Sequence, residues 1–330
     1  MWNLAATAAV VRRGSPIWGR LCAVSPPSPD DRTVRAAVTG AALDVVRAGA
    51  PPKVDVVAID DGLDLNSIDF LVPAGSDRTV LKALSSLARV RVVQVLSAGT
   101  DWIEDRLPPQ ATLCSARGAR DGPVAEWALA ALVGVSSGLL ECARIHTWTD
   151  RHLDDLAGWT VLVVGMGSIG GLLRERLQAL GTTVVGVASH ARDGMHGVDE
   201  LADLLPGADA VVLLTPLTDS TRGLIGAEEL AAMSDGALLV NAARGAVVDT
   251  EALVTETVTG RLRAVLDVTD PEPLPDDHPL WSAPGVVSIT PHIAGDSPLG
   301  HARAAELAAE QLVRWCAGEE LHNVVRDGSR

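Results

Sequence analysis

The stretch Val161-Leu-Val-Val-Gly-Met-Gly-Ser-Ile-Gly170 places glycines spaced G-x-G-x-x-G directly after a short apolar run. This pattern predicts a buried strand, a tight turn and the start of a helix. The first glycine makes the turn, the second lets the backbone approach a pyrophosphate, and the third lets the helix pack against the strand. Leucines at helical spacing and a second apolar run at 184–187 follow, so the context favours a dinucleotide site over an ordinary turn.

The chain of 330 residues carries a formal net charge of −15, and 47% of its residues are hydrophobic. This length predicts about two domains with large buried cores. Nucleic acid or an anionic membrane would need a basic face, so the charge argues against both as partners. Because the longest apolar runs are interrupted well before the ~20 residues that a membrane span needs, we expect a soluble protein.

The cysteines indicate neither a zinc site nor a disulfide framework, because no two of them have C-x-x-C spacing. We therefore expect no bound metal and a reducing, cytoplasmic location. Residues 4–11 form an apolar piece followed by Arg12 and Arg13, which reverses the charge-then-apolar order of a secretory signal. We interpret residues 1–19 as a loose extension. The four cysteines are Cys22, Cys114, Cys142 and Cys316.

The first third of the chain alternates strand-like and helix-like patterns. We expect strands at 21–24, 54–59, 70–72 and 90–95, and helices at 34–48 and 79–87. The last of these strands leads into the loop Ser97-Ala-Gly-Thr-Asp101, at a carboxyl strand end where α/β sheets bind ligands. A helix from Val124 to about Ala143 is too apolar all round to lie against solvent, so another domain or another subunit must cover it.

A second alternating region begins at the glycine pattern. After the strand that carries this pattern, further strands are expected at 184–187, 210–214, 237–240, 264–266 and 286–289, with helices at 200–205, 227–233 and 250–258. Six strands separated by helices predict a doubly wound parallel sheet of the Rossmann type. Such a sheet binds ligands beyond the carboxyl ends of its strands.

Three consecutive strand ends of this predicted sheet carry reactive side chains. Arg244 follows the fourth strand, Asp267 and Glu272 follow the fifth, and His292 follows the sixth. A guanidinium can hold a carboxylate or carbonyl oxygen through its fork of donors. A histidine can give a proton to a developing alkoxide, and a neighbouring carboxylate fixes its tautomer. A nicotinamide cofactor would carry the hydride.

These motifs together resemble the D-isomer-specific 2-hydroxyacid dehydrogenases, and are similar to glyoxylate/hydroxypyruvate reductases and to the phosphoglycerate dehydrogenase core. The resemblance covers residues 90–295, through the Ser-Ala-Gly-Thr-Asp loop, Val-Ala-Glu, the glycine pattern, Asn-Ala-Ala-Arg-Gly, Asp-Val…Glu-Pro and Thr-Pro-His. It implies a Rossmann domain at 123–296, inserted into a smaller flavodoxin-like α/β substrate domain made of 1–122 and 297–330. It also implies a homodimer that pairs through the helix at 124–143.

The resemblance assigns roles residue by residue. Arg244 would anchor the 2-oxo acid, Glu272 would support the histidine, and His292 would be the proton donor and acceptor. Main-chain N–H groups of Ala98 and Gly99 would bind the substrate carboxylate. Asp267 would contact the nicotinamide amide, and Thr215 and Pro216 would flank the adenosine half. The implied cofactor contacts are Gly165, Met166, Gly167, Ser168, Ile169, Gly170, Ser189, His190, Arg192, Thr215, Pro216, Ala242 and Asp267.

The end of the second strand departs from the pattern of NAD-preferring enzymes. Such enzymes carry Asp or Glu about 20 residues after the first glycine, where it binds the ribose hydroxyls. Here residues 187–192 contain Ser189, His190 and Arg192 and no carboxylate. Because these side chains could bind a 2′-phosphate, we predict that NADP(H) is favoured over NAD(H).

Three functions remain open from the sequence. The favoured one is an NADP(H)-dependent reductase of glyoxylate, hydroxypyruvate or a related small 2-oxo acid. The second is another member of the superfamily: a phosphoglycerate or other 2-hydroxyacid dehydrogenase that uses NAD, or an enzyme of formate or phosphite. Glu272 disfavours formate, since those enzymes resemble this motif with an amide at that position. The third is a dinucleotide-sensing regulatory protein without turnover.

Overall fold

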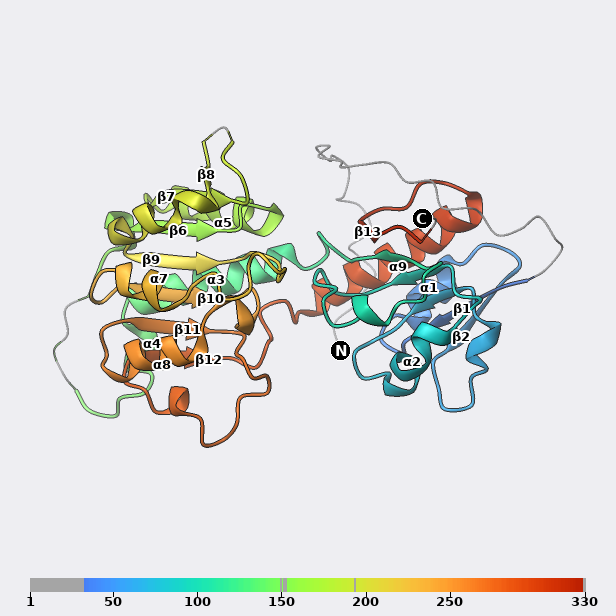
Figure 1. The fold of residues 1–330 in the computed structure, drawn as a ribbon, viewed down its shortest axis with the longest axis horizontal. Helices are drawn as coiled ribbons and strands as arrows, with labels where there is room; N and C mark the ends of the chain where they lie inside the picture. Colours follow the sequence, from blue (N-terminus) through green and yellow to red (C-terminus); the bar gives the residue numbers. More distant parts are fainter. Residues whose placement is uncertain (1–32, 149, 151–152, 193, 329–330) are drawn as a thin grey trace.

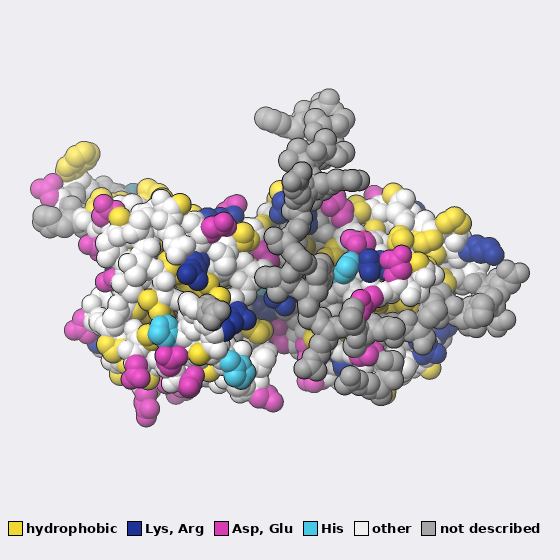
Figure 2. Space-filling view, turned by 90° about the horizontal axis from the view of Figure 1, so that it is seen from above, with side chains coloured by type: hydrophobic (Ala, Val, Ile, Leu, Met, Phe, Trp, Pro, Cys, Tyr) yellow, Lys and Arg dark blue, Asp and Glu magenta, His cyan; other side chains and the backbone are white. Residues whose placement is uncertain are grey.

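The computed structural model describes residues 33–148, 150, 153–192 and 194–328, which form two parallel-type sheets flanked by helices. Figure 1 shows the sheets in two lobes, with the C-terminal strand in the same lobe as the first strands of the chain. Acidic side chains are spread over the visible face of both lobes in Figure 2. Among the described residues, no helix is both long and apolar enough to cross a bilayer.

The first sheet has the strand order β13-β5-β4-β3-β1-β2. Five strands are parallel in the flavodoxin-like order, as the family resemblance implied, and β13 adds an antiparallel edge beside β5. Helix α9 packs against α1, and Trp315 of α9 lies 5.8 Å from Phe70, ring centre to ring centre, in the core. The elements are β1 (Val34–Val38), α1 (Leu43–Gly49), β2 (Val54–Ala58), β3 (Phe70–Val72), α2 (Arg78–Ala83), β4 (Val92–Gln94), β5 (Thr112–Cys114), α9 (Pro298–Ala317) and β13 (Val324–Arg326).

The helix predicted at 34–48 is wrong over its first half. Residues 34–38 form β1, which pairs with β2 on one side and with β3 on the other, and a shorter helix, α1, begins only at Leu43. The helical pattern of apolar residues was outweighed by pairing on both edges, a tertiary effect that a local pattern does not contain. The strand predicted at 21–24 lies outside the described residues.

The second sheet is parallel throughout, with the order β12-β11-β10-β9-β6-β7-β8. It contains the six predicted strands and one more, the two-residue edge strand β8. The chain order reverses between β6 and β9, and this is where sheets of this class bind nucleotides. The elements are β6 (Thr160–Val164), α5 (Ser168–Ala179), β7 (Thr183–Ala188), β8 (His196–Gly197), α6 (Leu201–Leu204), β9 (Ala210–Leu213), α7 (Ala227–Ala232), β10 (Leu238–Asn241), α8 (Thr250–Val258), β11 (Arg263–Leu266) and β12 (Val286–Ile289).

The apolar helix that follows the first sheet is shorter than predicted. Helix α3 (Asp121–Ser136) ends before Gly138, which has a left-handed φ of 65°, and a one-turn helix, α4 (Leu139–Cys142), follows. Glycine adopts this conformation without the steric penalty of a Cβ atom, so it ends the helix. Helix α3 packs mainly against α5 and thus belongs to the lobe of the second sheet.

Burial separates the cysteines into unreactive and reactive thiols. Desolvation raises the pKa of Cys114 to about 12 and that of Cys316 to about 11, whereas Cys142 is exposed. Because the thiolate is the nucleophile, we expect Cys142 to react first with a disulfide reagent near pH 8. Thiol titration of a Cys22→Ser variant measures the order in which the other three cysteines react. A fast thiol that persists after a further Cys142→Ser substitution contradicts it.

Candidate active site

The glycine turn has the geometry that a dinucleotide site requires. Gly165 has φ = 107°, and a Cβ there would lie 2.6 Å from the carbonyl carbon of Leu214 at the end of β9. A Cβ on Gly170 would lie 2.4 Å from the Gly165 oxygen. Both glycines are therefore required by the packing of the protein itself, and they bring α5 close to the end of β6.

Gly167 is different, because a Cβ there would meet no atom within 4 Å. Its lack of a side chain is not explained by protein packing and leaves room for a ligand to approach the backbone. Gly167 is also the N-cap of α5, whose first residues, Ser168 and Ile169, present N–H groups at the positive end of the helix dipole. These residues fit the pyrophosphate of a dinucleotide.

The segment after β7 reaches back to this turn. Arg192 donates from Nη2 to the main-chain oxygen of Met166 at 3.0 Å, which places its guanidinium beside the glycine turn. Ser189 and His190 are exposed at the end of β7 and lie 3.2 Å apart, Oγ to Nδ1. Thr215 and Pro216 follow β9 on the other side of the turn, and Ala242 follows β10. The predicted cofactor contacts therefore surround the switch point of the sheet.

The three predicted catalytic side chains come from three adjacent strands. Arg244 follows β10, Glu272 lies in the loop after β11, and His292 follows β12. Glu272 Oε1 lies 2.7 Å from His292 Nδ1, and both side chains are a little under half exposed. Because a carboxylate only accepts hydrogen bonds, this contact places the ring hydrogen on Nδ1 and leaves Nε2 for a substrate.

The backbone of His292 is held in an uncommon conformation. Its φ is +56°, a value that residues with a Cβ rarely adopt, and its N–H donates to the main-chain oxygens of Asp267 at 2.8 Å and Thr290 at 3.0 Å. The surrounding loop thus aims the imidazole in a direction that an extended chain would not give.

Asp267 is buried, and its carboxylate holds that loop. Oδ1 accepts from the Thr290 hydroxyl at 2.6 Å and from the Ile293 N–H at 2.8 Å, and Oδ2 accepts from the Ala294 N–H at 2.9 Å. A carboxylate has about four acceptor sites, so one site remains for another donor. The Asp267 carboxylate therefore holds the loop around His292 in place. Its contact with a nicotinamide amide stays a prediction.

Arg244 meets the loop of the first sheet that carries Gly99. Its Nη2 lies 3.1 Å from Asp101 Oδ1, and its Nε lies 3.2 Å from the same oxygen. A Cβ on Gly99 would lie 1.6 Å from Arg244 Nη2, so only glycine leaves space for the guanidinium. Within the described part of the chain, no acceptor engages the N–H groups of Ala98 and Gly99. The loop of residues 97–101 and the strand-end residue Arg244 thus contact each other.

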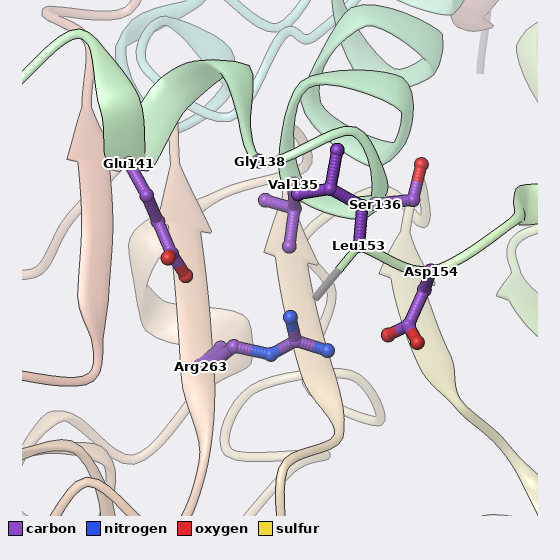
Figure 3. A pocket seen from close by; sticks show the side chains of 7 residues that line it. All are labelled: Val135, Ser136, Gly138, Glu141, Leu153, Asp154 and Arg263. Carbon is purple, nitrogen blue, oxygen red and sulfur yellow. The ribbon is translucent and has the colours of Figure 1, made fainter. Parts of the chain in front are cut away.

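A pocket of about 230 Å³ lies at another place and takes no part in this arrangement. Figure 3 shows it at the ends of α3 and α4, beside the first residue of β11, which is the opposite end of the strands from His292. Its arginine, Arg263, donates to the Gly236 oxygen at 2.8 Å and lies over the Trp159 ring. The Gly236 carbonyl oxygen and the Trp159 ring thus engage the charge of Arg263 within the fold.

Two groups of this site, Asp101 and Thr290, had no role predicted from the sequence. Asp101 ends the Ser-Ala-Gly-Thr-Asp loop, and Thr290 begins the Thr-Pro-His motif. Asp101 has no sequence signal as a partner of Arg244, since the two are 143 positions apart. Thr290 could have been noticed, because it lies two residues before His292 at the end of the same strand.

The chain is similar to known proteins over most of its length. A family model described as D-isomer specific 2-hydroxyacid dehydrogenase, NAD binding domain, matches residues 129–294. A glyoxylate reductase from Aeropyrum pernix is 32% identical over 78% of this chain and 82% of that protein. A D-3-phosphoglycerate dehydrogenase from Mycobacterium tuberculosis is 34% identical over 92% of this chain but only 52% of that protein.

Solved structures show the same likeness. The NADPH-dependent glyoxylate/hydroxypyruvate reductase from Sinorhizobium meliloti, in complex with NADP and sulfate, superposes with a TM-score of 0.75. It is 26% identical, and the match covers 90% of this chain and all of that one. Similarity therefore extends over both sheets and is not confined to the nucleotide-binding half.

Proposed function

Because the chain belongs to the family of D-isomer specific 2-hydroxyacid dehydrogenases, which are NAD(P)-dependent oxidoreductases, we propose that it reduces a small 2-oxo acid such as glyoxylate or hydroxypyruvate with NADPH. The observation that carries this proposal is that Arg244 contacts the Gly99 loop at the strand-end edge of the second sheet, the edge at which the Glu272–His292 pair also lies.

In the proposed reaction the nicotinamide supplies the hydride that the 2-oxo carbon accepts. Arg244 holds the carbonyl oxygen and the carboxylate through its N–H groups, and the N–H groups of Ala98 and Gly99 bind the same carboxylate. His292 gives the proton on Nε2 to the carbonyl oxygen, which yields the 2-hydroxy acid. Glu272 stabilises the imidazolium form and keeps Nε2 directed at the substrate.

The test is the loss of reduced-nicotinamide absorbance with NADPH and NADH in parallel. The acids are glyoxylate, hydroxypyruvate, pyruvate, phenylpyruvate and 3-phosphohydroxypyruvate. Fast turnover of a small acid with NADPH supports the proposal. Turnover of the phosphorylated acid with NADH favours the second candidate, a phosphoglycerate dehydrogenase, to which the mycobacterial relative points. Tight cofactor binding without turnover of any acid contradicts both and favours a regulatory protein.

The cofactor preference follows from the charge beside the glycine turn. Arg192 is exposed next to Met166, and Ser189 and His190 offer further hydrogen bonds at the end of β7. A 2′-phosphate would pair with the guanidinium, and residues 187–192 contain no carboxylate that could accept from a free ribose hydroxyl. NADPH is therefore the proposed cofactor, as in the complex of the Sinorhizobium enzyme with NADP.

Replacing Arg192 by alanine is expected to lower kcat/KM for NADPH by about 10- to 100-fold, because a charge-assisted hydrogen bond contributes about 1.5–3 kcal/mol. The kcat/KM for NADH should stay within about twofold of the wild-type value. Steady-state kinetics with each cofactor measure the ratio, and Arg78→Ala, at an exposed arginine of α2, is the matched control. Equal losses of kcat/KM with NADPH and with NADH would show that Arg192 does not select between the cofactors.

We also propose a cytoplasmic homodimer that pairs through the segment 124–143. Large apolar side chains remain exposed at this end of the lobe: Val133 on α3, Leu139 on α4, and Leu153 after them. Leu139 is 66% exposed, an unusual state for a leucine beside other apolar groups. Contact with a second subunit would cover these side chains and remove their apolar area from water.

The dimer proposal predicts that Leu139→Glu converts the protein to a monomer. A charge placed in an apolar contact costs several kcal/mol unless it finds a partner. Sedimentation equilibrium gives the mass, and Val258→Glu, at an exposed valine of α8, is the control that should leave it unchanged. A wild-type protein that sediments as a monomer contradicts the proposal directly.

A further inference from the structure

The carboxylate of Asp101 occupies one edge of the guanidinium of Arg244. Nε donates to Oδ1 at 3.2 Å and to Oδ2 at 3.3 Å, and Nη2 forms an ion pair with Oδ1 at 3.1 Å. The carboxylate therefore lies beside the Nε–Nη2 edge of the planar group, with both of its oxygens on Nε. Asp101 lies in the loop after β4 of the first sheet, whereas Arg244 follows β10 of the second sheet, so the contact joins the two lobes.

The remaining donors of Arg244 can be counted. A guanidinium has five N–H groups. Asp101 takes Nε–H, and the main-chain oxygen of Ala243 takes one N–H of Nη1 at 2.7 Å. Among the described residues, this leaves one N–H on Nη1 and both N–H groups of Nη2 without a hydrogen-bond acceptor. The N–H groups that remain on the two terminal nitrogens form the end-on fork, which suits the two oxygens of a 2-oxo carboxylate.

The Gly99 backbone provides a second, independent sign that this position is built for a guanidinium. A Cβ at residue 99 would lie 1.6 Å from Nη2 and 2.8 Å from Cζ of Arg244. The space left by Gly99 and the carboxylate of Asp101 therefore together form the binding position of the Arg244 guanidinium. Asp101 and Arg244 keep side-chain exposures of 33% and 25%, so the pair lies beside solvent that a substrate could displace.

We propose that Asp101 is a positioning residue, which fixes the rotation of the Arg244 guanidinium so that its end-on fork points at the substrate. The inference rests on the proposed function, in which Arg244 holds the 2-oxo acid. A partly exposed pair of this kind contributes little to folding stability, so its effect lies in orientation. A rotation that displaces the fork by about 1 Å lowers catalysis by up to about 10²-fold.

The first experiment compares substitutions at Asp101. Asp101→Ala should lower kcat/KM for the preferred 2-oxo acid by about 10- to 100-fold and leave the Kd of the cofactor unchanged. Asp101→Asn should lose clearly less, because an amide oxygen at the place of Oδ1 still accepts from Nε. Asp105→Ala, which removes an exposed carboxylate from the same loop, is the matched control and should stay near the wild-type value.

The second experiment is a double-mutant cycle with Arg244→Ala. If Asp101 acts through the arginine, its replacement by alanine has no further effect once Arg244 is gone. An equal loss in both backgrounds overturns the proposal. An increase of kcat/KM in Asp101→Ala also overturns it, because Asp101 would then compete with the substrate for Arg244. A normal kcat/KM in Arg244→Ala alone contradicts the proposed function instead, which separates the two failures.

Discussion

The variant His292→Ala is expected to lose about 10²- to 10⁴-fold in kcat, the range that general acid–base catalysis contributes, and to bind the cofactor with an unchanged Kd. The reason is local. The Nδ1 atom of His292 is engaged by Glu272 at 2.7 Å, and Nε2 is the proton donor of the proposed reaction. Nothing in the glycine turn depends on this imidazole, because the turn lies at β6 and the histidine follows β12.

Single-turnover kinetics with preformed complex would separate this loss from slow product release. The matched control is His278→Ala, a histidine of the same lobe whose Nδ1 accepts from the Leu280 N–H at 3.3 Å in the segment before β12. Glu272→Gln should give an intermediate rate, because an amide can still bond the ring but does not stabilise its cation. A His292→Ala enzyme that keeps a rate within threefold of the wild type would remove the histidine from the mechanism.

The order of the strands along the chain predicted that Arg244, Glu272 and His292 lie at the same edge of one sheet, and this has a definite physical reason. In a parallel sheet all carboxyl ends lie at one edge, so residues that follow consecutive strands are neighbours whatever their distance along the chain. The strands themselves were found from short apolar runs, and the predictions at 70–72 and 286–289 agree with β3 and β12 in every residue. The helix at 250–258 also agrees, because Asp249 caps it through the Ala252 N–H.

The remaining features depend on contacts that no local pattern contains. The inner strand β1 was predicted as helix, since its pairing with β2 and β3 lies outside the window in which periodicity is read. The edge strand β8 has two residues, which are too few to give a period. The Asp101–Arg244 contact joins two sheets, and the carboxylate of Asp267 accepts from a loop that begins 23 residues later. Such pairs follow from the fold and not from spacing.

The second large effect is expected for Asp267→Ala, which removes a buried carboxylate and should lower both the free energy of unfolding and kcat. The substitution leaves the buried N–H of Ala294 without its acceptor, which costs about 1–3 kcal/mol in the free energy of unfolding. It also releases Thr290 and Ile293 on either side of His292. Since the left-handed backbone of His292 is itself unfavourable by about 1–3 kcal/mol, the loop should relax and kcat should fall by about 10²-fold.

A stability-matched control separates positioning from general destabilisation. Asp249→Ala removes the N-cap of α8, where the carboxylate accepts from the Ala252 N–H at 3.0 Å, and should cost about 0.5–2 kcal/mol. Because α8 does not hold His292, kcat should remain near the wild-type value in that variant. Urea unfolding and steady-state kinetics on both proteins give the comparison. If the two variants lose stability alike and neither loses turnover, Asp267 supports only the fold, and the direction of His292 is set by its main-chain bonds to Asp267 and Thr290.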